Sequence, residues 1–270
     1  MHICLIGCGK MGAALLEGWR KLSVINEITV VEPSKINVSK NIKEKNNIFF
    51  YDHLSKIKFN YLPDVVILAV KPQIMEIVLL EIKKSGIKSS CWLTIAAGLP
   101  INFYENILGK NQSIVRTIPN TPASILKGVT AICFNKNCKR DHIVNANLLM
   151  EAVGIILQVR DESLMDSITA VSGSGPAYIF YMIEAMIDAA IHIGIDKDDA
   201  TKLVEATLVG SAFLLENSKD EVGELRHAVT SPKGTTEAGL SILSNNDSFF
   251  ILIRNAIEEA QKRGKELGKL

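Results

Sequence analysis

The first residues that could do chemistry are glycines near the N-terminus. Gly7-Cys8-Gly9-Lys10-Met11-Gly12 fits the pattern G-x-G-x-x-G, follows the apolar segment Ile3–Ile6 and opens the helical pattern Ala13–Leu22. The first glycine of such a loop permits a tight turn, the second lets the backbone approach a pyrophosphate, and the third allows close helix–strand packing. The helix N-terminus presents free N–H groups to phosphate. The segment therefore predicts a dinucleotide site formed by all six of these residues.

An acidic residue stands at the expected distance from this loop. Glu32 ends the second predicted strand about 20 residues after Gly12, where an acid binds the ribose hydroxyls of NAD. A 2′-phosphate would meet carboxylate repulsion there, but Ser34 and Lys35 follow and could contact such a phosphate. Alternatively, Glu32 is only a solvated charge at a strand end. NADH is the first expectation for the cofactor, with use of NADPH close behind.

Two further turns follow predicted strands. Ala69-Val70-Lys71-Pro72 and Ile95-Ala96-Ala97-Gly98 lie just past carboxyl ends of strands, where open α/β sheets bind ligands. Lys71 could equally be a solvated lysine before a proline. A third turn, Pro119-Asn120-Thr121-Pro122, is rigid because its two prolines fix φ on either side of Asn120, which could form an Asx turn.

A second loop of possible binding residues lies in the C-terminal half. Ser231-Pro232-Lys233-Gly234-Thr235-Thr236 precedes a predicted helix, so its N–H groups and hydroxyls could bind a carboxylate. Thr235 or Thr236 could instead be an ordinary helix N-cap.

The elements that position these residues change character along the chain. Predicted strands lie at His2–Ile6, Ile28–Glu32, Ile48–Phe50, Val65–Val70, Trp92–Ile95, Ser113–Thr117, Val129–Phe134 and Ile155–Val159. Helices are predicted between most of them, such as Gly12–Leu22, Ile36–Lys45 and Gln73–Lys84, and then at Glu162–Val171, Ala177–Gly194, Lys197–Asn217, Asp220–Ala228, Thr235–Ser244 and Asp247–Leu267. Alternating strands and helices predict a mostly parallel sheet covered on both faces. The fold class is α/β plus all-α: a Rossmann-type dinucleotide-binding domain at residues 1–160 and a helical domain at 161–270.

Composition excludes several classes of function. The net charge of +1 gives no field that would attract nucleic acid or an anionic membrane. No stretch reaches the roughly 18 apolar residues of a membrane span, and the first strand pattern begins at His2, so we expect a cytoplasmic protein without a leader. The five cysteines form no C-x-x-C pair, and Cys133 and Cys138 are taken to lack histidine partners. We therefore expect no metal and interpret the cysteines as small buried residues in a reducing cytosol.

His2, His53, His142 and His192 are interpreted as structural or surface residues.

Two further segments add to the turns described above. They are Ser172-Gly173-Ser174-Gly175-Pro176-Ala177-Tyr178 and Leu225–Gly239, which reads LRHAVTSPKGTTEAG. Their order and spacing resemble the pyrroline-5-carboxylate reductase family over essentially all 270 residues. The resemblance implies hydride transfer from NADH or NADPH to the C=N bond of 1-pyrroline-5-carboxylate, giving L-proline in the last step of proline biosynthesis.

The family pattern also implies roles for individual residues. It implies cofactor contacts for Ala69, Val70, Lys71, Pro72, Ala96, Ala97, Gly98 and Asn120, beside Gly7–Gly12, Glu32 and Ser34. It implies substrate contacts for Val171, Ser172, Gly173, Ser231, Gly234, Thr235 and Thr236. A threonine hydroxyl is a good hydrogen-bond donor, so Thr236 is the candidate catalytic residue, which steadies the imine nitrogen and relays a solvent proton.

The chain departs from the family pattern at three positions. Lys233 stands where a second glycine is usual, Glu237 at an often apolar position, and His227 in place of Asp or Asn. Lys233 and Glu237 are four residues apart and could form an exposed ion pair, or Lys233 could reach the substrate carboxylate.

The sequence leaves three rival functions. β-Hydroxyacid dehydrogenases have a catalytic lysine and an asparagine on the helix after a glycine-rich segment, and neither residue follows Gly175 here. Another imine reductase or a dinucleotide-sensing protein without catalysis is the remaining alternative, although both threonines of the substrate loop are present.

Assembly is predicted from the apolar helices. Ala177–Gly194 is apolar on most of its surface, and Gly210-Ser211-Ala212 would let another helix approach closely. We expect a homodimer through the helical domains. The family resemblance adds a decamer of five such dimers.

Overall fold

The computed structural model describes residues 1–34, 47–57 and 59–268. By their internal contacts these residues form two compact units: unit 1 comprises 1–174 and 260–270, and unit 2 comprises Gly175–Glu259. The predicted helix Ile36–Lys45 and Lys35 lie outside the described residues. No helix among those described has the length and the apolar run that crossing a bilayer requires.

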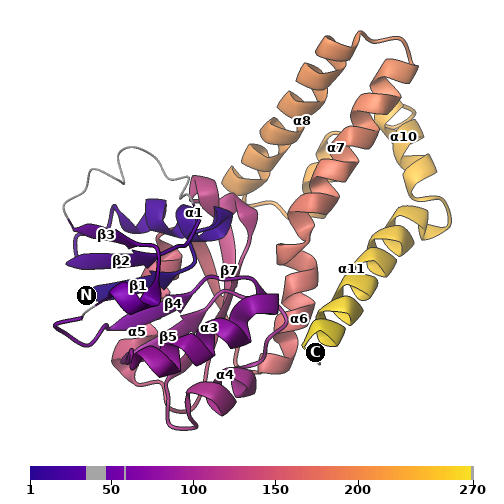
Figure 1. Ribbon diagram of the computed structural model, residues 1–270. Helices are drawn as coiled ribbons and strands as arrows, with labels where there is room; N and C mark the ends of the chain where they lie inside the picture. The colour runs from indigo at the N-terminus through magenta and orange to yellow at the C-terminus, as the bar shows by residue number, and fades with distance from the viewer. Residues whose placement is uncertain (35–46, 58, 269–270) are drawn as a thin grey trace. The chain divides into compact units, whose positions relative to one another are not determined.

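Unit 1 is built on one eight-stranded sheet with the order β3-β2-β1-β4-β5-β6-β7-β8 (Figure 1). The strands are β1 (His2–Ile6), β2 (Glu27–Val31), β3 (Ile48–Tyr51), β4 (Val65–Leu68), β5 (Cys91–Thr94), β6 (Ile114–Pro119), β7 (Gly128–Phe134) and β8 (Gly154–Gln158). All neighbouring pairs are parallel except β6 with β7. The eight predicted strands and the mostly parallel sheet are confirmed.

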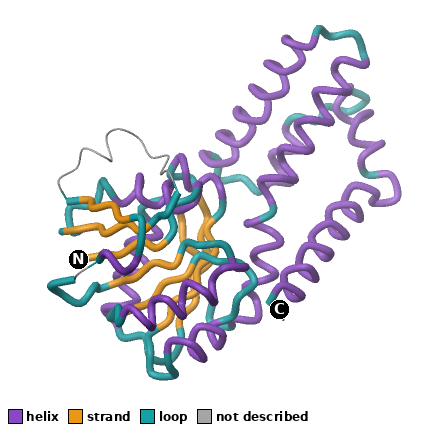
Figure 2. The backbone as a smooth tube through the Cα atoms, viewed as in Figure 1, coloured by secondary structure: helices purple, strands orange, loops and turns teal. Residues whose placement is uncertain are grey.

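Helices cover both faces of this sheet, as the tube view makes plain (Figure 2). They are α1 (Lys10–Trp19), α3 (Pro72–Ser85), α4 (Ile101–Leu108), α5 (Arg140–Glu151) and α6 (Met165–Ile168), with short turns η1 (Leu54–Lys56), η2 (Thr121–Ile125), η3 (Glu162–Leu164) and η4 (Thr169–Gly173). Strand residues alternate between faces: Ile3 and Leu5 of β1 pack with α1 and α5, whereas Cys4 and Ile6 pack with α3, α4 and α6. The Trp19 indole N–H donates to the Leu149 carbonyl at 2.8 Å and ties α1 to α5.

Unit 2 is entirely helical. It contains α7 (Gly175–His192), α8 (Lys197–Asn217), α9 (Val222–Ala228), α10 (Thr235–Leu243), η5 (Asn245–Asp247) and most of α11 (Ser248–Leu267). Helices α7 and α8 run alongside each other (Figure 1). Asp196 caps α8, because its carboxylate accepts the Asp198 N–H at 2.9 Å.

The compact units divide the chain at a different place from the predicted boundary at residue 160. Residues 161–174 belong with the sheet because Met165 is buried in the core cluster on the α3 and α4 face. The C-terminal turns of α11 belong there too, since the Gln261 side-chain amide donates to the Ser167 hydroxyl at 2.5 Å.

Candidate functional site

A cavity of about 380 Å³ opens at the carboxyl ends of the first strands of unit 1. Strand β1 lies between β2 and β4, so this is the point where the strand order reverses and where open α/β sheets bind ligands. The predicted cofactor residues that line the cavity are Gly7, Gly9, Glu32, Ser34, Ala69, Val70 and Lys71. The structure therefore brings together residues from three separate turns.

The three loop glycines have different surroundings. Gly7 has φ +91°, and a Cβ there would lie 2.7 Å from the Ala69 carbonyl oxygen. A Cβ on Gly12 would lie 2.6 Å from the Gly7 oxygen, so this glycine permits close packing inside the loop. A Cβ on Gly9 would meet nothing within 4 Å, and Gly9 is the N-cap of α1 without a side-chain cap. Gly9 thus keeps space open beside the unpaired N–H groups of a helix N-terminus.

Glu32 is fixed in position by hydrogen bonds. One carboxylate oxygen accepts the Cys8 N–H at 2.7 Å, and the other accepts the Ser34 hydroxyl at 2.5 Å and the Ser34 N–H at 3.0 Å. Partial burial alone would raise the pKa of this carboxyl, but the hydrogen bonds from Ser34 and Cys8 hold its pKa below the ordinary value. Glu32 is therefore an oriented anion at the cavity, not a freely solvated strand-end charge.

The remaining predicted cofactor residues lie outside the cavity lining. Cys8 is buried, Lys10 and Met11 begin α1, and Pro72 occupies the first turn of α3. Ala96, Ala97 and Gly98 follow β5 at the same edge of the sheet. A Cβ on Gly98 would lie 3.1 Å from the Leu267 Cβ, so this glycine admits the end of α11. Their predicted cofactor contacts stay predictions.

Asp52 and His53 are among the cavity residues that the sequence pattern did not indicate as binding residues. Asp52 and His53 follow β3 and line the cavity beside Glu32. His53 was interpreted as a structural or surface residue, and that interpretation did not place its side chain at a ligand cavity. A signal was available, because β3 was predicted and its carboxyl end must lie at the same edge as those of β1 and β2.

Asn120 connects two of the predicted segments. It is buried, its amide group donates to the Ser172 carbonyl at 3.0 Å, and its oxygen accepts the Val129 N–H at 2.8 Å. The side chain therefore bridges the turn after β6 to η4 instead of forming the Asx turn that was the alternative.

Val171, Ser172 and Gly173 form part of η4, a single π-helical turn. Such turns are rare and occur frequently at functional sites. Val171 is exposed and the Ser172 hydroxyl donates to the Ile168 carbonyl at 3.0 Å.

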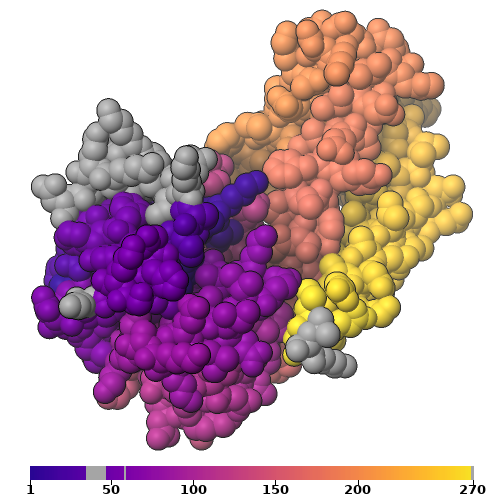
Figure 3. Space-filling view, in the orientation of Figure 1, coloured from indigo at the N-terminus to yellow at the C-terminus, as the bar shows by residue number. Residues whose placement is uncertain are grey.

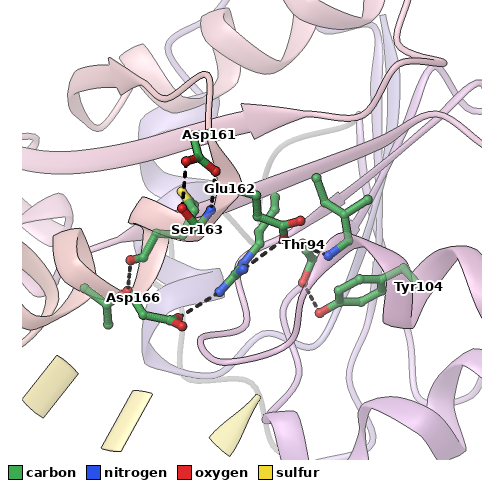
Figure 4. A network of polar contacts seen from close by, with 10 residues as sticks. Thr94, Tyr104, Asp161, Glu162, Ser163 and Asp166 are labelled. Atoms are coloured by element: carbon green, nitrogen blue, oxygen red, sulfur yellow. Dashed lines mark hydrogen bonds and ion pairs between the residues drawn. The ribbon is translucent and has the colours of Figure 1, made fainter. Parts of the chain in front are cut away.

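A buried ion-pair network anchors this part of the chain to the sheet. Arg116 of β6 is 3% exposed and contacts Glu162 at 2.9 Å and Asp166 at 3.2 Å. The close-up view shows Glu162 near Thr94, whose hydroxyl lies 2.7 Å from that of Tyr104, and Asp166 on the other side of the network (Figure 4). Sequence reasoning missed Arg116, because an arginine inside a strand does not reveal its partners more than 40 residues away.

In unit 2 the predicted substrate loop makes a tight turn before α10. The Gly234 N–H donates to the Ser231 carbonyl at 3.0 Å, and a Cβ on Gly234 would collide with the Ser231 hydroxyl oxygen. Gly234 itself is the N-cap, without a side-chain cap. Thr235 and Thr236 are therefore first-turn residues and not the N-caps that were the alternative.

The two departures in this loop are linked. Lys233 has φ +59°, the left-handed region that favours glycine. Its backbone N–H donates to the Glu237 carboxylate at 2.7 Å. The contact that the structure shows between these two described residues is thus a backbone hydrogen bond, in place of the predicted side-chain ion pair. His227 lies on α9 and, with Glu237, lines a cavity of about 700 Å³ formed with α10 and α11.

Known proteins match both parts of the chain. Residues 162–267 match the family described as pyrroline-5-carboxylate reductase dimerisation, and residues 2–98 match the family described as NADP oxidoreductase, coenzyme F420-dependent. The pyrroline-5-carboxylate reductase of Methanosarcina acetivorans is 36% identical over 275 residues, which cover 99% of this chain and 98% of that protein. The enzyme of Pseudomonas aeruginosa is also 36% identical, with coverage of 99% and 97%.

The chain belongs to the pyrroline-5-carboxylate reductase family. Solved structures agree with this assignment. That of the Coxiella burnetii pyrroline-5-carboxylate reductase is 34% identical with a TM-score of 0.88, covering 99% of this chain and 98% of that one. The Plasmodium falciparum pyrroline carboxylate reductase, solved with NADP bound, is 31% identical with a TM-score of 0.83, covering 99% and 98%. The predicted family and the predicted fold class are confirmed.

Proposed function

We propose that this chain reduces 1-pyrroline-5-carboxylate to L-proline with a reduced nicotinamide dinucleotide, as the last step of proline biosynthesis in the cytoplasm. The observation that carries the proposal is end-to-end similarity to enzymes of this name, at 36% identity over 99% of the chain. A cytoplasmic location agrees with the five cysteines, all of which are free. The reaction as proposed needs no metal ion.

The cofactor is proposed to bind in the cavity beside Gly9 and Glu32. The open space at Gly9 and the N-terminus of α1 fit a pyrophosphate. The Glu32 oxygen that accepts the Cys8 N–H retains a lone pair for a ribose hydroxyl, whereas the other oxygen already accepts two hydrogen bonds from Ser34. A 2′-phosphate would bring a second anion to this point, so we propose that NADH is preferred over NADPH.

The substrate carboxylate is proposed to bind at Ser231, Gly234, Thr235 and Thr236, with Val171, Ser172 and Gly173 as further substrate contacts. The first turn of α10 has N–H groups without intrahelical acceptors, and its N-cap has no side chain to satisfy them. Those donors and the positive end of the helix dipole favour an anion.

The chemistry requires a hydride and a proton. The reduced nicotinamide supplies the hydride to the carbon of the C=N bond. The imine nitrogen gains the proton, and we propose that the Thr236 hydroxyl donates a hydrogen bond to this nitrogen and relays a proton from solvent. The sequence of α7 contains no lysine, unlike the helix that carries the catalytic lysine in β-hydroxyacid dehydrogenases.

A homodimer formed by unit 2 is part of the proposal, and five dimers are proposed to assemble into a decamer. Within residues 175–259, all of them described, the buried apolar residues are Ala200 and Val204. In the space-filling view α7 and α8, drawn in orange, present open surface on the visible face (Figure 3). The exposed apolar side chains of this unit include Ile179, Phe180 and Tyr181 of α7, and exposed apolar surface of this kind is typical of a permanent interface.

The proposed activity is tested with the purified full-length chain. We expect oxidation of NADH on addition of 1-pyrroline-5-carboxylate, with L-proline as the product. Gly9→Ala should fold normally, because its Cβ meets nothing within 4 Å, yet it should raise the cofactor KM by about tenfold or more, a loss of about 1.4 kcal/mol. Gly223→Ala is the matched control, since its Cβ also meets nothing within 4 Å. Absence of proline formation with either cofactor would refute the proposed function.

A further inference from the structure

Three side chains that the proposed reaction does not use converge elsewhere in unit 1. Cys91 is the first residue of β5, Cys138 lies in the turn after β7, and His142 lies in the first turn of α5. One potential ligand atom from each lies within 4.8 Å of the other two. In the part of the chain that the structure describes, this is the one place where three or more side chains able to bind a metal ion come together. The expectation that Cys138 lacks a histidine partner is therefore wrong.

The cluster is separate from the cofactor cavity. Cys91 begins β5, whereas the turn Ile95–Gly98 follows the other end of the same strand. At about 3.3 Å per residue, the four residues of β5 separate the two ends by roughly 10–13 Å. No residue of the cluster lines the cofactor cavity. A ligand bound here would act away from the reacting atoms.

We propose that Cys91, Cys138 and His142 form a binding site for a zinc ion. Two thiolates and one imidazole are a donor set that Zn²⁺ prefers, with water in the fourth position of a tetrahedron. From the usual Zn–S and Zn–N lengths, tetrahedral ligand atoms lie about 3.5–3.8 Å apart. The observed separations of 4.8 Å or less require small side-chain rotations and no movement of the backbone elements.

The hydrogen bonds of the metal-free cluster determine what zinc must replace. The Cys91 thiol donates to the Trp92 carbonyl at 3.9 Å, and the Cys138 thiol donates to the Ile114 carbonyl at 3.3 Å. His142 Nδ1 accepts the Lys139 N–H at 3.2 Å. Coordination through Nδ1 displaces that N–H, and coordination through Nε2 leaves Nδ1 protonated and unable to accept it. Zinc therefore releases two thiol protons and ends one capping hydrogen bond.

The loss of two thiol protons and of one hydrogen bond determines how tightly zinc can bind at this site. Binding must weaken as pH falls, because two protons compete with each zinc ion. Cys138 and His142 are half-buried and give the ion access from solvent, whereas Cys91 is fully buried. The site is thus an exchangeable one that joins β5, the turn after β7 and α5, and zinc should stabilise the fold without being required for it.

The test uses the full-length protein, reduced and freed of metal with a chelator. Zn²⁺ is titrated against a chromophoric competitor, and Co²⁺ is added separately to detect thiolate ligation by its charge-transfer absorption in the near ultraviolet. We expect one equivalent of each ion per chain and a zinc-induced rise in Tm. Cys138→Ser should weaken zinc at least about 100-fold, since loss of mere outer-shell partners already costs 10–100-fold.

A matched variant separates this site from other thiols. Cys4→Ala removes a buried cysteine of β1 that is not part of the cluster, and it should keep the stoichiometry, the cobalt band and the rise in Tm. His142→Gln should weaken zinc while leaving both thiols. Zinc affinity unchanged by Cys138→Ser, or no binding by the reduced protein, would overturn the proposal. Failure of the reduced protein to bind zinc, together with a Cys91–Cys138 disulfide after peroxide treatment, would show a redox pair in place of a metal site.

Discussion

Units 1 and 2 differ in how their apolar side chains are covered. Unit 1 buries one cluster on each face of its sheet, with side chains as large as Trp19 and Tyr104 fully enclosed. Unit 2 leaves Phe180 61% and Tyr181 74% exposed. The same chain therefore contains a unit with its own core and a unit that leaves large apolar side chains exposed.

The predicted ligand-binding loops of the two units also differ in how they are held in place. The loop of unit 1 is held by the Glu32 carboxylate, which accepts the Cys8 N–H, and by a glycine that packs against Ala69. The loop of unit 2 is exposed, and its hydrogen bonds include the one that closes the short turn from Ser231 to Gly234 and the one from the Lys233 N–H to Glu237. We infer that unit 1 supplies a preformed cofactor site, whereas the loop of unit 2 gains its final environment on assembly.

The largest expected effect comes from placing a charge on the uncovered surface of unit 2. Phe180→Arg should be tolerated by the protomer, where this position is 61% exposed. In a dimer the arginine would be buried without a partner, which costs several kcal/mol. We expect loss of the dimer together with loss of activity, measured by light scattering and steady-state assay. Ile77→Arg is the control: position 77 on α3 is 60% exposed, and we expect it to keep both properties. A wild-type enzyme that is monomeric and fully active would contradict the inference that the exposed apolar surface of unit 2 forms a dimer interface.

The second effect concerns the catalytic role proposed for Thr236. Thr236→Val keeps the volume of the side chain and removes its hydroxyl. We expect kcat to fall about 100-fold, as for loss of one preorganised donor at a reacting centre, with the cofactor KM unchanged. Thr201→Val removes a hydroxyl that donates to the Lys197 carbonyl within α8, and it should leave kcat unchanged. An unchanged kcat with a raised substrate KM would make Thr236 a binding residue only.

Periodic features of the chain could be predicted from sequence. The bounds of β1 and α8 were predicted without error, and the other strands to within about two residues. The run Val65–Leu68, buried throughout, is typical of a central parallel strand. The cofactor loop was predictable because its glycines, the preceding strand and the following helix are adjacent in sequence.

Contacts between distant segments could not be predicted. The bridge from Asn120 to Ser172 and the ion pairs of Arg116 depend on how far-apart segments pack. The convergence of Cys91 with Cys138 is of the same kind, although the spacing of Cys138 and His142 was visible in the sequence. The sequence pattern does not single out helices α4 and α5, since short helices between strands carry a weak periodic signal.

Cofactor choice should reveal how firmly the loop of unit 1 is preformed. We expect kcat/KM to be about tenfold higher with NADH than with NADPH, from one repulsive contact at Glu32. The pKa of this carboxyl lies below its ordinary 4.5, so the hydrogen bonds to its ionised form contribute stability above that pH and are lost as pH falls through the folded-state pKa. The Glu32 charge should therefore stay constant from pH 8 down to about 5, and the preference should narrow below about pH 6, where the 2′-phosphate gains a proton.

A pair of variants checks the cause of that preference. Glu32→Gln should narrow the gap between the two cofactors by removing the charge, whereas Ser34→Ala should change it less because the carboxylate remains. A wild-type enzyme that prefers NADPH would shift the explanation to Ser34 and to Lys35.

The smallest effect concerns the strained backbone in the loop of unit 2. Lys233 has φ +59°, a conformation that costs a residue with a Cβ about 1–2 kcal/mol. Lys233→Gly removes this strain but gives the unfolded chain more freedom, which costs about 0.4–1 kcal/mol. We expect a net gain in the free energy of unfolding of about 1 kcal/mol or less, from denaturant titration. Lys202→Gly, on an exposed face within α8, should instead lose about 1 kcal/mol. Because the backbone N–H that Glu237 accepts is present in glycine as well, the substrate KM should stay unchanged. If both glycines destabilise the protein alike, the left-handed turn at residue 233 is not the reason that the family favours glycine there.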